Sequence, residues 1–419
     1  MQTLSQLQSG QLHGIKKLQL KEELTHFPEE IFTLSHSLEI LDLSGNNLCE
    51  LPDLSPLKKL KIAFFSYNDF KEIPSVFKRC ENLYMLGFKA NKIECFDEDI
   101  LPLSISWLIL TDNKIKELPR SIGKLSLLQK CALAGNEILK LPLSMKKCRN
   151  LELLRLSANN LEEFPSFLLT LPKLSWLAFS GNPFCEKVSY SLQEHAYEDL
   201  DIQELLGEGA SGEIYKAYSK TMKKEVAFKL FKGAVTSDGY AKDEMNAYMS
   251  TGEHEGLIKV LAKLQGANRL GLILELIPKS FTNLGLPPSL ETCTRDTFKD
   301  SASFSLEGII TILKAICTAA IHLHSKGLMH GDLYAHNILV NEEYKSYLGD
   351  FGAASFYDTS KKEYEQLEVR AFGCLMQDLL NLCHDKEGKK YFNLKSLAKN
   401  CMQENVQNRP LFQAVFTEL

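Results

Sequence analysis

A glycine-rich run in the second half of the chain has the residue types of a phosphate-binding loop. It reads Leu206-Gly207-Glu208-Gly209-Ala210-Ser211-Gly212. Glycine has no Cβ atom, so the backbone can approach phosphate oxygens closely. Dinucleotide-binding folds use the same spacing, but there a helix follows the glycines. Here residues 213–218 and 225–231 alternate like strands instead, so we expect a strand on each side of the glycines.

A second group of residues carries oxygen and nitrogen donors in a fixed order. It reads His330-Gly331-Asp332-Leu333-Tyr334-Ala335-His336-Asn337, and Asp350-Phe351-Gly352 comes 18 residues after Asp332. Carboxylate and amide oxygens are the ligands that Mg²⁺ requires. One such Asp or Asn would usually lie in a turn or cap a helix. The complete ordered set instead indicates a site for phosphate transfer.

These motifs together resemble the protein kinase family over residues 200–419. Val226-Ala227-Phe228-Lys229 is similar to the lysine-bearing strand of that family. The resemblance implies that Lys229 holds the phosphates of ATP and that Glu244, in a helix expected over residues 238–250, pairs with it. It also implies that Asp332 orients the substrate hydroxyl and accepts its proton, while Asn337 and Asp350 bind Mg²⁺.

The resemblance further implies where the nucleotide lies. Residues 272–276 look like the strand that enters the adenine hinge, with Leu274 as the gatekeeper. The residues expected to contact ATP are Leu206, Gly207, Gly209, Gly212, Ile214, Ala227, Lys229, Glu275 and Leu276.

The chain departs from the family around the activation segment. Gly331 stands where most kinases have the Arg that reads an activation-loop phosphate, so this switch is expected to be absent. Only 15 residues separate Gly352 from Glu368, and no Ala-Pro-Glu motif occurs. Arg409 is therefore expected to lack its usual glutamate partner. Glu368 itself replaces the usual Asp of the core helix.

Two further departures leave the substrate class open. Tyr334 stands where many serine/threonine kinases have Lys, and His336 stands where some tyrosine kinases have Arg and could contact the γ-phosphate. The short activation segment is also similar to small-molecule kinases of the aminoglycoside-phosphotransferase type. A catalytically weak scaffold is a third alternative, although the residues that a pseudokinase usually loses are all present: Lys229, Glu244, Asp332, Asn337 and Asp350. We expect a protein kinase, with Ser/Thr as the acceptor by base rate.

The first half of the chain repeats one unit. The frame L-x-x-L-x-L-x-x-N-x-L recurs every 22 or 23 residues, with its asparagines at Asn46, Asn68, Asn91, Asn113, Asn136, Asn159 and Asn182. A weaker first copy places Leu18 and Leu20 in register. No copy can bury its leucines alone, so the copies must stack. The pattern resembles the leucine-rich-repeat family over residues 15–184, which implies a horseshoe with parallel strands on its concave side.

One row of side chains on the expected concave face is largely apolar. It consists of Ile40, Ile62, Met85, Trp107, Lys130, Leu153 and Trp176, with Phe64 and Ile109 in the neighbouring row. Trp is frequent among binding hot spots. We expect a protein substrate or regulator to bind at Trp107, Trp176, Phe64 and Ile109. The alternative is that these residues pack on each other or on the rest of the chain.

The whole chain is thus expected to be a multidomain protein, with a leucine-rich-repeat α/β solenoid followed by a two-lobed α+β kinase-like fold. The expected parts are residues 1–184 as repeats, 185–199 as a short joint and 200–419 as the kinase, a combination that resembles bacterial leucine-rich-repeat kinases. The net charge of −5 argues against nucleic acid as a partner. The 11 scattered cysteines indicate free thiols in a reducing compartment. Because neither a signal peptide nor a membrane span is recognisable, we expect a cytoplasmic protein that uses ATP and Mg²⁺.

Overall fold

The chain folds into two compact units. The computed structural model describes residues 2–185, 192–209, 211–233, 236, 238–265 and 270–419. One unit comprises Met1–Leu171 and Asn182–Phe184, and the other comprises Pro172–Gly181 and Cys185–Leu419. Pro172–Gly181, which the repeat frame assigns to the last copy, therefore packs as part of the second unit. The expected boundaries at residues 184 and 200 remain predictions, and residues 186–191 of the expected joint lie outside the described residues.

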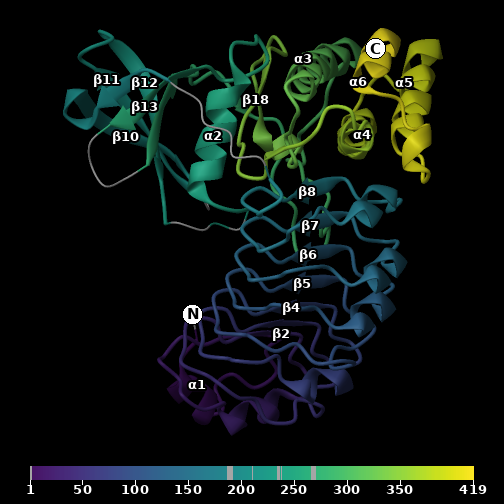
Figure 1. Cartoon of the computed structure of the whole chain (residues 1–419). Coiled ribbons are helices and arrows are strands. Elements are labelled where there is room, and N and C mark those ends of the chain that lie inside the picture. Colours follow the sequence, from purple (N-terminus) through teal and green to yellow (C-terminus); the bar gives the residue numbers. More distant parts are fainter. Residues whose placement is uncertain (1, 186–191, 210, 234–235, 237, 266–269) are drawn as a thin grey trace. The chain divides into compact units, whose positions relative to one another are not determined.

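The first unit is a stack of parallel strands, as the repeat frame predicts (Figure 1). After the short helix α1 (Leu4–Gln8), its strands are β1 (Lys17–Gln19), β2 (Ile40–Asp42), β3 (Ile62–Phe64), β4 (Met85–Gly87), β5 (Trp107–Ile109), β6 (Lys130–Ala132) and β7 (Leu153–Arg155). Each pairs with the next in register, and Leu18 of β1 lies opposite Leu41 of β2. This register confirms the weak first copy.

The repeat asparagines tie neighbouring copies together through their side chains. Asn46 Oδ1 accepts from the backbone amides of Glu22 and Leu24, both at 3.0 Å. Its Nδ2 donates to the carbonyls of Leu20 at 2.9 Å and Leu43 at 2.8 Å. The side chain thus satisfies buried backbone groups that the turn leaves without a ladder partner, which is why the frame requires an amide at this position.

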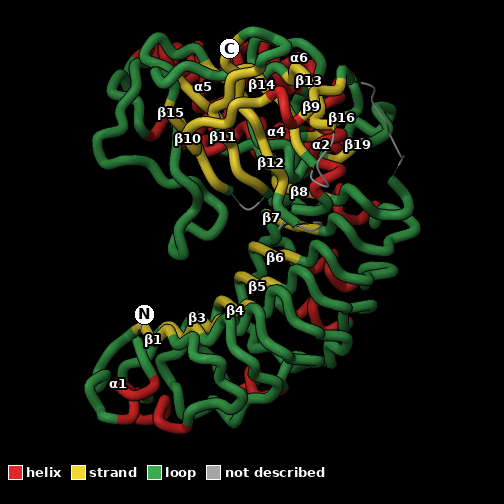
Figure 2. Tube along the Cα trace, turned by 90° about the vertical axis from the view of Figure 1, so that its left-hand side faces the viewer, coloured by secondary structure: helices red, strands yellow, loops and turns green. Residues whose placement is uncertain are grey.

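Short 3-10 helices form the side of the stack opposite the strands (Figure 2). Each begins directly after a proline, whose fixed φ and missing N–H suit the first residue of a turn. They are η1 (Glu29–Leu34), η2 (Ser75–Arg79), η3 (Arg120–Lys124), η4 (Leu143–Lys147) and η5 (Ser166–Thr170). The strands and these turns enclose a core of buried leucine, isoleucine and phenylalanine side chains.

The second unit begins with β8 (Trp176–Ala178) and a six-stranded sheet in the order β10-β11-β12-β14-β13-β9. Its strands are β9 (Glu194–Ala196), β10 (Leu200–Glu208), β11 (Gly212–Ser219), β12 (Lys224–Phe231), β13 (Val260–Gln265) and β14 (Gly271–Glu275), with the turn η6 (Tyr197–Asp199) before β10. Strands β10 and β11 flank the glycine run, so the expected strand-glycines-strand arrangement is confirmed. Helix α2 (Ala241–Thr251) follows β12; it begins three residues later than expected.

Helices dominate the rest of the second unit. They are α3 (Leu306–Ser325), α4 (Glu363–Asn381), α5 (Gly388–Cys401) and α6 (Phe412–Glu418), with the turns η7 (Ala335–Asn337) and η8 (Val406–Asn408). Small strand pairs complete this lobe: β15 (Thr282–Asn283), β17 (Ile338–Val340) and β18 (Ser346–Leu348) in one sheet, and β16 (Leu328–Met329) with β19 (Ser355–Phe356) in another. The two lobes agree with the expected α+β kinase-like fold.

Helix α3 is long and apolar enough to cross a bilayer by length and composition, the only such helix among the residues that the structure describes. It carries Glu307 and Lys314. Its apolar side chains Ile309, Leu313 and Ile316 are fully buried, and it packs against α4, α6 and β18. The apolar composition is therefore accounted for by the core of the helical lobe.

Candidate active site

The glycine loop joins β10 to β11 and is closed by a backbone hydrogen bond from Gly209 N to Gly212 O at 2.9 Å. A Cβ atom on Gly212 would lie 2.3 Å from the carbonyl oxygen of Leu230, so β12 itself requires glycine there. Among the described residues, no atom lies within 4 Å of the place of a Cβ on Gly207 or Gly209. Their lack of a side chain has no packing reason, which agrees with close approach to a ligand. Ala210 lies outside the described residues.

Lys229 and Glu244 form a buried ion pair between β12 and α2. Lys229 is 4% exposed and Glu244 is 2% exposed. Burial opposes the lysine charge, but Tyr248, Glu244 and Asp350 outweigh burial and raise the pKa of Lys229. The lysine is therefore a fixed positive charge between β12 and α2, and the structure brings together the two residues that the sequence predicted as a pair.

The strand register places the expected hinge beside the lysine strand. In the β12–β14 pair, Ala227 lies opposite Leu274 and Lys229 lies opposite Leu272. Ile214 of β11 lies opposite Lys229 on the other side. Ala227 and Leu274 are buried, Ile214 and Leu276 are half-buried, and Leu206 and Glu275 are exposed. Contact of these residues with ATP remains a prediction.

Residues 330–337, which we call the catalytic loop after their predicted role, hold Asp332 and Asn337 in direct contact. Asn337 Nδ2 donates to the backbone carbonyl of Asp332 at 2.9 Å and to its Oδ2 at 3.1 Å. The asparagine amide hydrogens therefore go to Asp332, which leaves the amide oxygen as the group able to meet a cation. Strand β17 starts at the next residue, so the hairpin with β18 fixes Asn337 at its end.

Asp350 follows the other strand of this hairpin. Ile338 lies opposite Leu348, and Gly349 N donates to Asn337 O at 2.9 Å. Burial opposes ionisation of Asp350, but the charge of Lys229 and the amide of Gly352 outweigh burial and lower its pKa. An ionised carboxylate and an amide oxygen thus emerge at one end of the hairpin, a donor set that suits a divalent metal completed by phosphate oxygens. Among the described residues, no three His, Cys, Asp or Glu side chains form a metal-binding group of their own.

Edge-on and tilted contacts between three rings connect α2 to the catalytic loop. The rings of Tyr248 and Phe351 are 4.8 Å apart, and those of Phe351 and His330 are 5.0 Å apart. The hydroxyl of Tyr248 also accepts from the amide of Asp350 at 3.2 Å. Our sequence reasoning missed Tyr248. The signal was available, because a residue four positions after Glu244 lies on the same helix face.

Glu368 of α4 supports the catalytic loop from below. Its carboxylate accepts from the amides of His330 at 3.1 Å and Gly331 at 2.6 Å, and it pairs with His324 at 2.8 Å. Burial opposes ionisation of Glu368, but His324 and His330, with the Gly331 amide, lower its pKa. Glu368, which is one methylene longer than the usual Asp, thus accepts hydrogen bonds from the two backbone amides that precede Asp332. This departure from the family therefore does not disrupt the loop.

His336 has a carboxylate partner beside the catalytic loop. Its Nδ1 lies 2.6 Å from Asp296 Oδ1, and its backbone amide donates to Asp296 Oδ2 at 3.2 Å. Burial opposes the imidazolium, but the hydrogen bond and charge of Asp296 raise the pKa of His336. The contact of His336 with a γ-phosphate remains a prediction.

Trp176 does not lie where a partner could reach it. Its side chain is 1% exposed, and its ring stacks on Tyr334 with centroids 4.4 Å apart. The prediction that Trp176 binds a partner is therefore wrong, and the alternative that it packs within the chain applies. Trp107, Phe64 and Ile109 of the first unit are half-buried.

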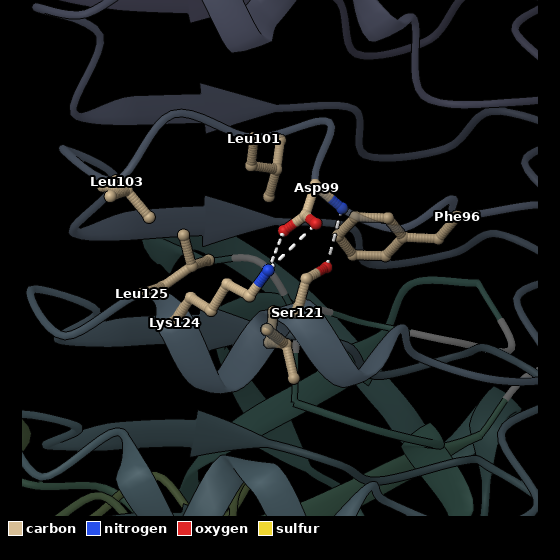
Figure 3. Close-up of a pocket in the computed structure, with 8 residues that line it drawn as sticks. Phe96, Asp99, Leu101, Leu103, Ser121, Lys124 and Leu125 are labelled. Carbon is tan, nitrogen blue, oxygen red and sulfur yellow. Dashed lines mark hydrogen bonds and ion pairs between the residues drawn. The ribbon is translucent and has the colours of Figure 1, made fainter.

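A small pocket in the first unit is occupied by the protein's own side chains. Figure 3 shows Lys124 reaching the carboxylate of Asp99, at 2.6 and 2.9 Å, with the Asp99 amide donating to Ser121 Oγ at 2.9 Å. Phe96 and Leu101 form part of the lining. The ion pair and the hydrogen bond link Asp99 of one repeat to Lys124 and Ser121 of the next. We therefore assign these side chains to the packing of the two repeats against each other.

The comparisons with known proteins agree with this geometry. Residues 200–373 match the model of the protein kinase domain, and residues 37–60 match the leucine-rich repeat. Residues 200–373 therefore carry a protein kinase domain, and the first unit includes a leucine-rich repeat at residues 37–60.

Similar proteins are kinases and receptors from distant organisms. Fibroblast growth factor receptor 1 of Xenopus laevis is 29% identical over 197 residues, which cover 42% of this chain and 24% of the receptor. The L-type lectin-domain containing receptor kinase V.7 of Arabidopsis thaliana is 28% identical, over 46% of this chain and 29% of that kinase. Serine/threonine-protein kinase fray1 of Dictyostelium discoideum is 26% identical, over 40% and 28%. The chain thus spans less than a third of the length of these relatives.

Proposed function

We propose that this chain transfers the γ-phosphoryl group of ATP to a hydroxyl group of a protein. The observation that carries the proposal is that the Lys229–Glu244 pair and the Asp332–Asn337 contact are formed together in one unit, joined by the ring contacts of Tyr248, Phe351 and His330. In kinases these parts must be in place at the same time, because catalysis rests on positioning and charge stabilisation.

The residues divide the reaction between them. Lys229 places a fixed positive charge beside the phosphates, and Gly207 and Gly209 let the loop backbone approach them. Asp332 orients the acceptor hydroxyl and takes its proton as the new oxygen–phosphorus bond forms and ADP leaves. Asn337 and Asp350 would hold Mg²⁺, which supplies positive charge to the phosphate oxygens.

Serine or threonine is the acceptor that we propose. Fray1 is, by its name, a serine/threonine-protein kinase, and the kinase domain of this chain is similar to it. Tyr334 replaces the lysine that would be diagnostic, so the support comes from similarity. We further propose a cytoplasmic location, on the basis that Cys131, Cys317 and Cys401 are buried thiols that form no disulfide among the described residues and that such thiols are typical of reducing compartments.

Replacing Lys229 by methionine should lower phosphate transfer from γ-labelled ATP with Mg²⁺ by about 10²-fold or more, because the fixed charge at the phosphates is lost. The matched control is Lys216→Met. Lys216 also pairs with a glutamate on this sheet, Glu225, at 2.6 Å, but the pair lies between β11 and β12 on the exposed part of the sheet.

The assay separates the competing functions. Label on protein that is lost in Lys229→Met and kept in Lys216→Met supports the protein kinase, and phosphoamino-acid analysis then identifies the acceptor. Label that appears only on added small hydroxyl compounds would instead favour a small-molecule kinase. ATP binding without any transfer would favour a scaffold.

We also propose that the concave row of the repeats recruits the protein substrate or a regulator. Trp107 is half-buried, its ring lies 4.2 Å below the ammonium group of Lys130, and its Nε1 has no hydrogen-bond partner among the described residues. Phe64 and Ile109, both half-buried, lie on the same face because β3, β4 and β5 pair in register. A half-buried aromatic ring is the kind of group that serves as an anchor at interfaces.

Replacing Trp107 by alanine should raise the KM for the protein substrate by roughly 30-fold, the loss of a hot spot of about 2 kcal/mol. The kcat and the KM for ATP should stay unchanged, because the residue lies outside the kinase unit. Leu143→Ala is the control, since Leu143 is a large exposed residue on the 3-10 side of the stack. An unchanged KM in Trp107→Ala would show that the row does not recruit the substrate.

A further inference from the structure

Ten residues of the last repeat, Pro172–Gly181, fold as part of the kinase unit. They include β8, whose three residues are all buried. This stretch, which we call the bracing segment, contacts the catalytic loop, the short stretch after Asp350-Phe351-Gly352 and the end of the helical lobe. The expected activation segment, which would follow Asp350-Phe351-Gly352, is severely shortened here.

Trp176 holds the two residues that directly follow Asp332. Its Nε1 donates to the carbonyl of Leu333 at 3.2 Å. Its ring lies flat on that of Tyr334, at 4.4 Å and 6°, and Tyr334 in turn packs against the ring of His336 at 5.0 Å. One side chain of the bracing segment therefore fixes both the backbone and a side chain of the catalytic loop.

The bracing segment also explains the glycine before Asp332. Gly331 has a φ of +73°, and a Cβ atom there would lie 2.7 Å from the carbonyl oxygen of Leu177 and 2.5 Å from that of Ala353. No residue with a side chain fits this space without moving backbone. The arginine that most kinases carry at this position is thus incompatible with a segment that packs directly on the loop.

The N-terminal end of the segment, at Pro172, accepts a hydrogen bond from Arg409. The sequence leaves this arginine without the glutamate partner that it has in the family. Arg409 Nη2 donates to the carbonyl of Pro172 at 2.7 Å, and its other nitrogens donate to the carbonyls of Gln403 at 2.8 Å and Gln366 at 3.2 Å. A carbonyl of the bracing segment therefore stands where the family has a carboxylate.

Two further sets of contacts hold the middle and the C-terminal end of the segment. Arg370 of α4 donates to Ser175 Oγ at 2.9 Å. Ser355 Oγ accepts from the amides of Phe179 at 3.0 Å and Ser180 at 3.2 Å. The segment is thus fixed at both ends and in the middle by groups of the helical lobe, each of them buried.

We propose that the bracing segment does the work of the missing activation segment and that Trp176 is the residue through which it positions Asp332. The proposal rests on the proposed phosphoryl transfer and adds how its catalytic loop is held. Four separate departures from the family have one cause under this proposal: the glycine at 331, the shortened stretch after Gly352, the tyrosine at 334 and the arginine at 409 without an acid. The loop is then organised by packing, without a phosphate on an activation loop.

The test compares Trp176→Leu and Trp176→Phe with wild type, all as the full chain. In Trp176→Leu, which loses both the ring and the N–H, kcat should fall by about tenfold or more, because small misplacements of a reacting group are costly. The KM for ATP should change by less than about twofold, since Lys229 and the glycine loop are untouched. Trp176→Phe keeps a ring on Tyr334 and should regain most of the kcat.

A stability control and a second measurement keep the outcome clear. Tyr391→Leu removes a buried ring of α5 and should lower the melting temperature without this kcat effect. Hydrogen exchange of the amides of residues 330–338 should speed up in Trp176→Leu and not in Tyr391→Leu. Wild-type kcat and wild-type exchange in Trp176→Leu would overturn the proposal. If wild type itself transfers no phosphate, the proposed function fails, and the exchange of the loop amides still decides whether Trp176 positions the loop.

Discussion

Replacing Asp332 by asparagine should lower kcat by about 10³-fold, because the variant keeps the shape of the side chain and loses the group that accepts the hydroxyl proton. Asn337 donates to Asp332 through the backbone carbonyl as well as the side chain, so the loop should keep its geometry. The affinity for ATP should change by less than about twofold, since Lys229 and the glycine loop are unaltered. Single-turnover transfer from γ-labelled ATP and equilibrium nucleotide binding measure the two effects separately.

The control for this variant is Asp358→Asn. Asp358 is exposed, and its carboxylate accepts from the backbone amide of the nearby Ser360 at 2.9 Å. It should transfer phosphate at the wild-type rate. If Asp332→Asn kept more than about a tenth of the wild-type rate, Asp332 would not act as the general base and the assignment of the catalytic loop would have to be revised.

Replacing Gly331 by alanine should lower the free energy of unfolding of the kinase unit by about 3 kcal/mol and reduce transfer strongly. A non-glycine residue at positive φ costs about 1–2 kcal/mol, and here the new Cβ would also press on the carbonyls of Leu177 and Ala353. Relief of that contact must shift either the bracing segment or the loop that carries Asp332. Thermal unfolding followed in parallel with labelled-phosphate transfer gives both quantities.

Gly388→Ala separates backbone strain from the close contact. Gly388 also has a positive φ, of +88°, but no protein atom lies near the place of its Cβ. Alanine there should cost only about 1 kcal/mol and leave transfer unchanged. Equal losses of stability in the two variants would mean that the approach of Leu177 to Gly331 contributes nothing.

The sequence predicts one contact of the site directly, because phosphate transfer restricts both the type and the spacing of its residues. Lys229 and Glu244 form the expected pair, whereas the contact of Asn337 with Asp332 was not predicted. The repeats were predictable for a related reason, since each asparagine must satisfy backbone groups of the copy before it. In both cases the residues follow one another at short, fixed spacings, because each position meets a chemical or hydrogen-bonding requirement of its own.

The parts that could not be predicted depend on long-range packing. The repeat frame places Trp176 in the same row as Trp107, but its packing partner Tyr334 lies 158 residues further along the chain, and no local pattern encodes that contact. Glu368 could be recognised as a departure, whereas its two amide donors follow only from where α4 places it. The position of a side chain on its strand is thus easier to predict than the distant residue that packs on that side chain.

The position of the bracing segment has a consequence for modularity. Domain shuffling usually joins units at the point where one repeating pattern ends, which here is Asn182. A recombination event at that point, or an expression clone that starts at residue 185, would deliver the glycine loop, the lysine and the catalytic loop, but not the Trp176 ring that lies on Tyr334. The last repeat and the kinase would therefore have to be inherited together, while the copies before residue 172 could vary in number or sequence without loss of the catalytic loop's support.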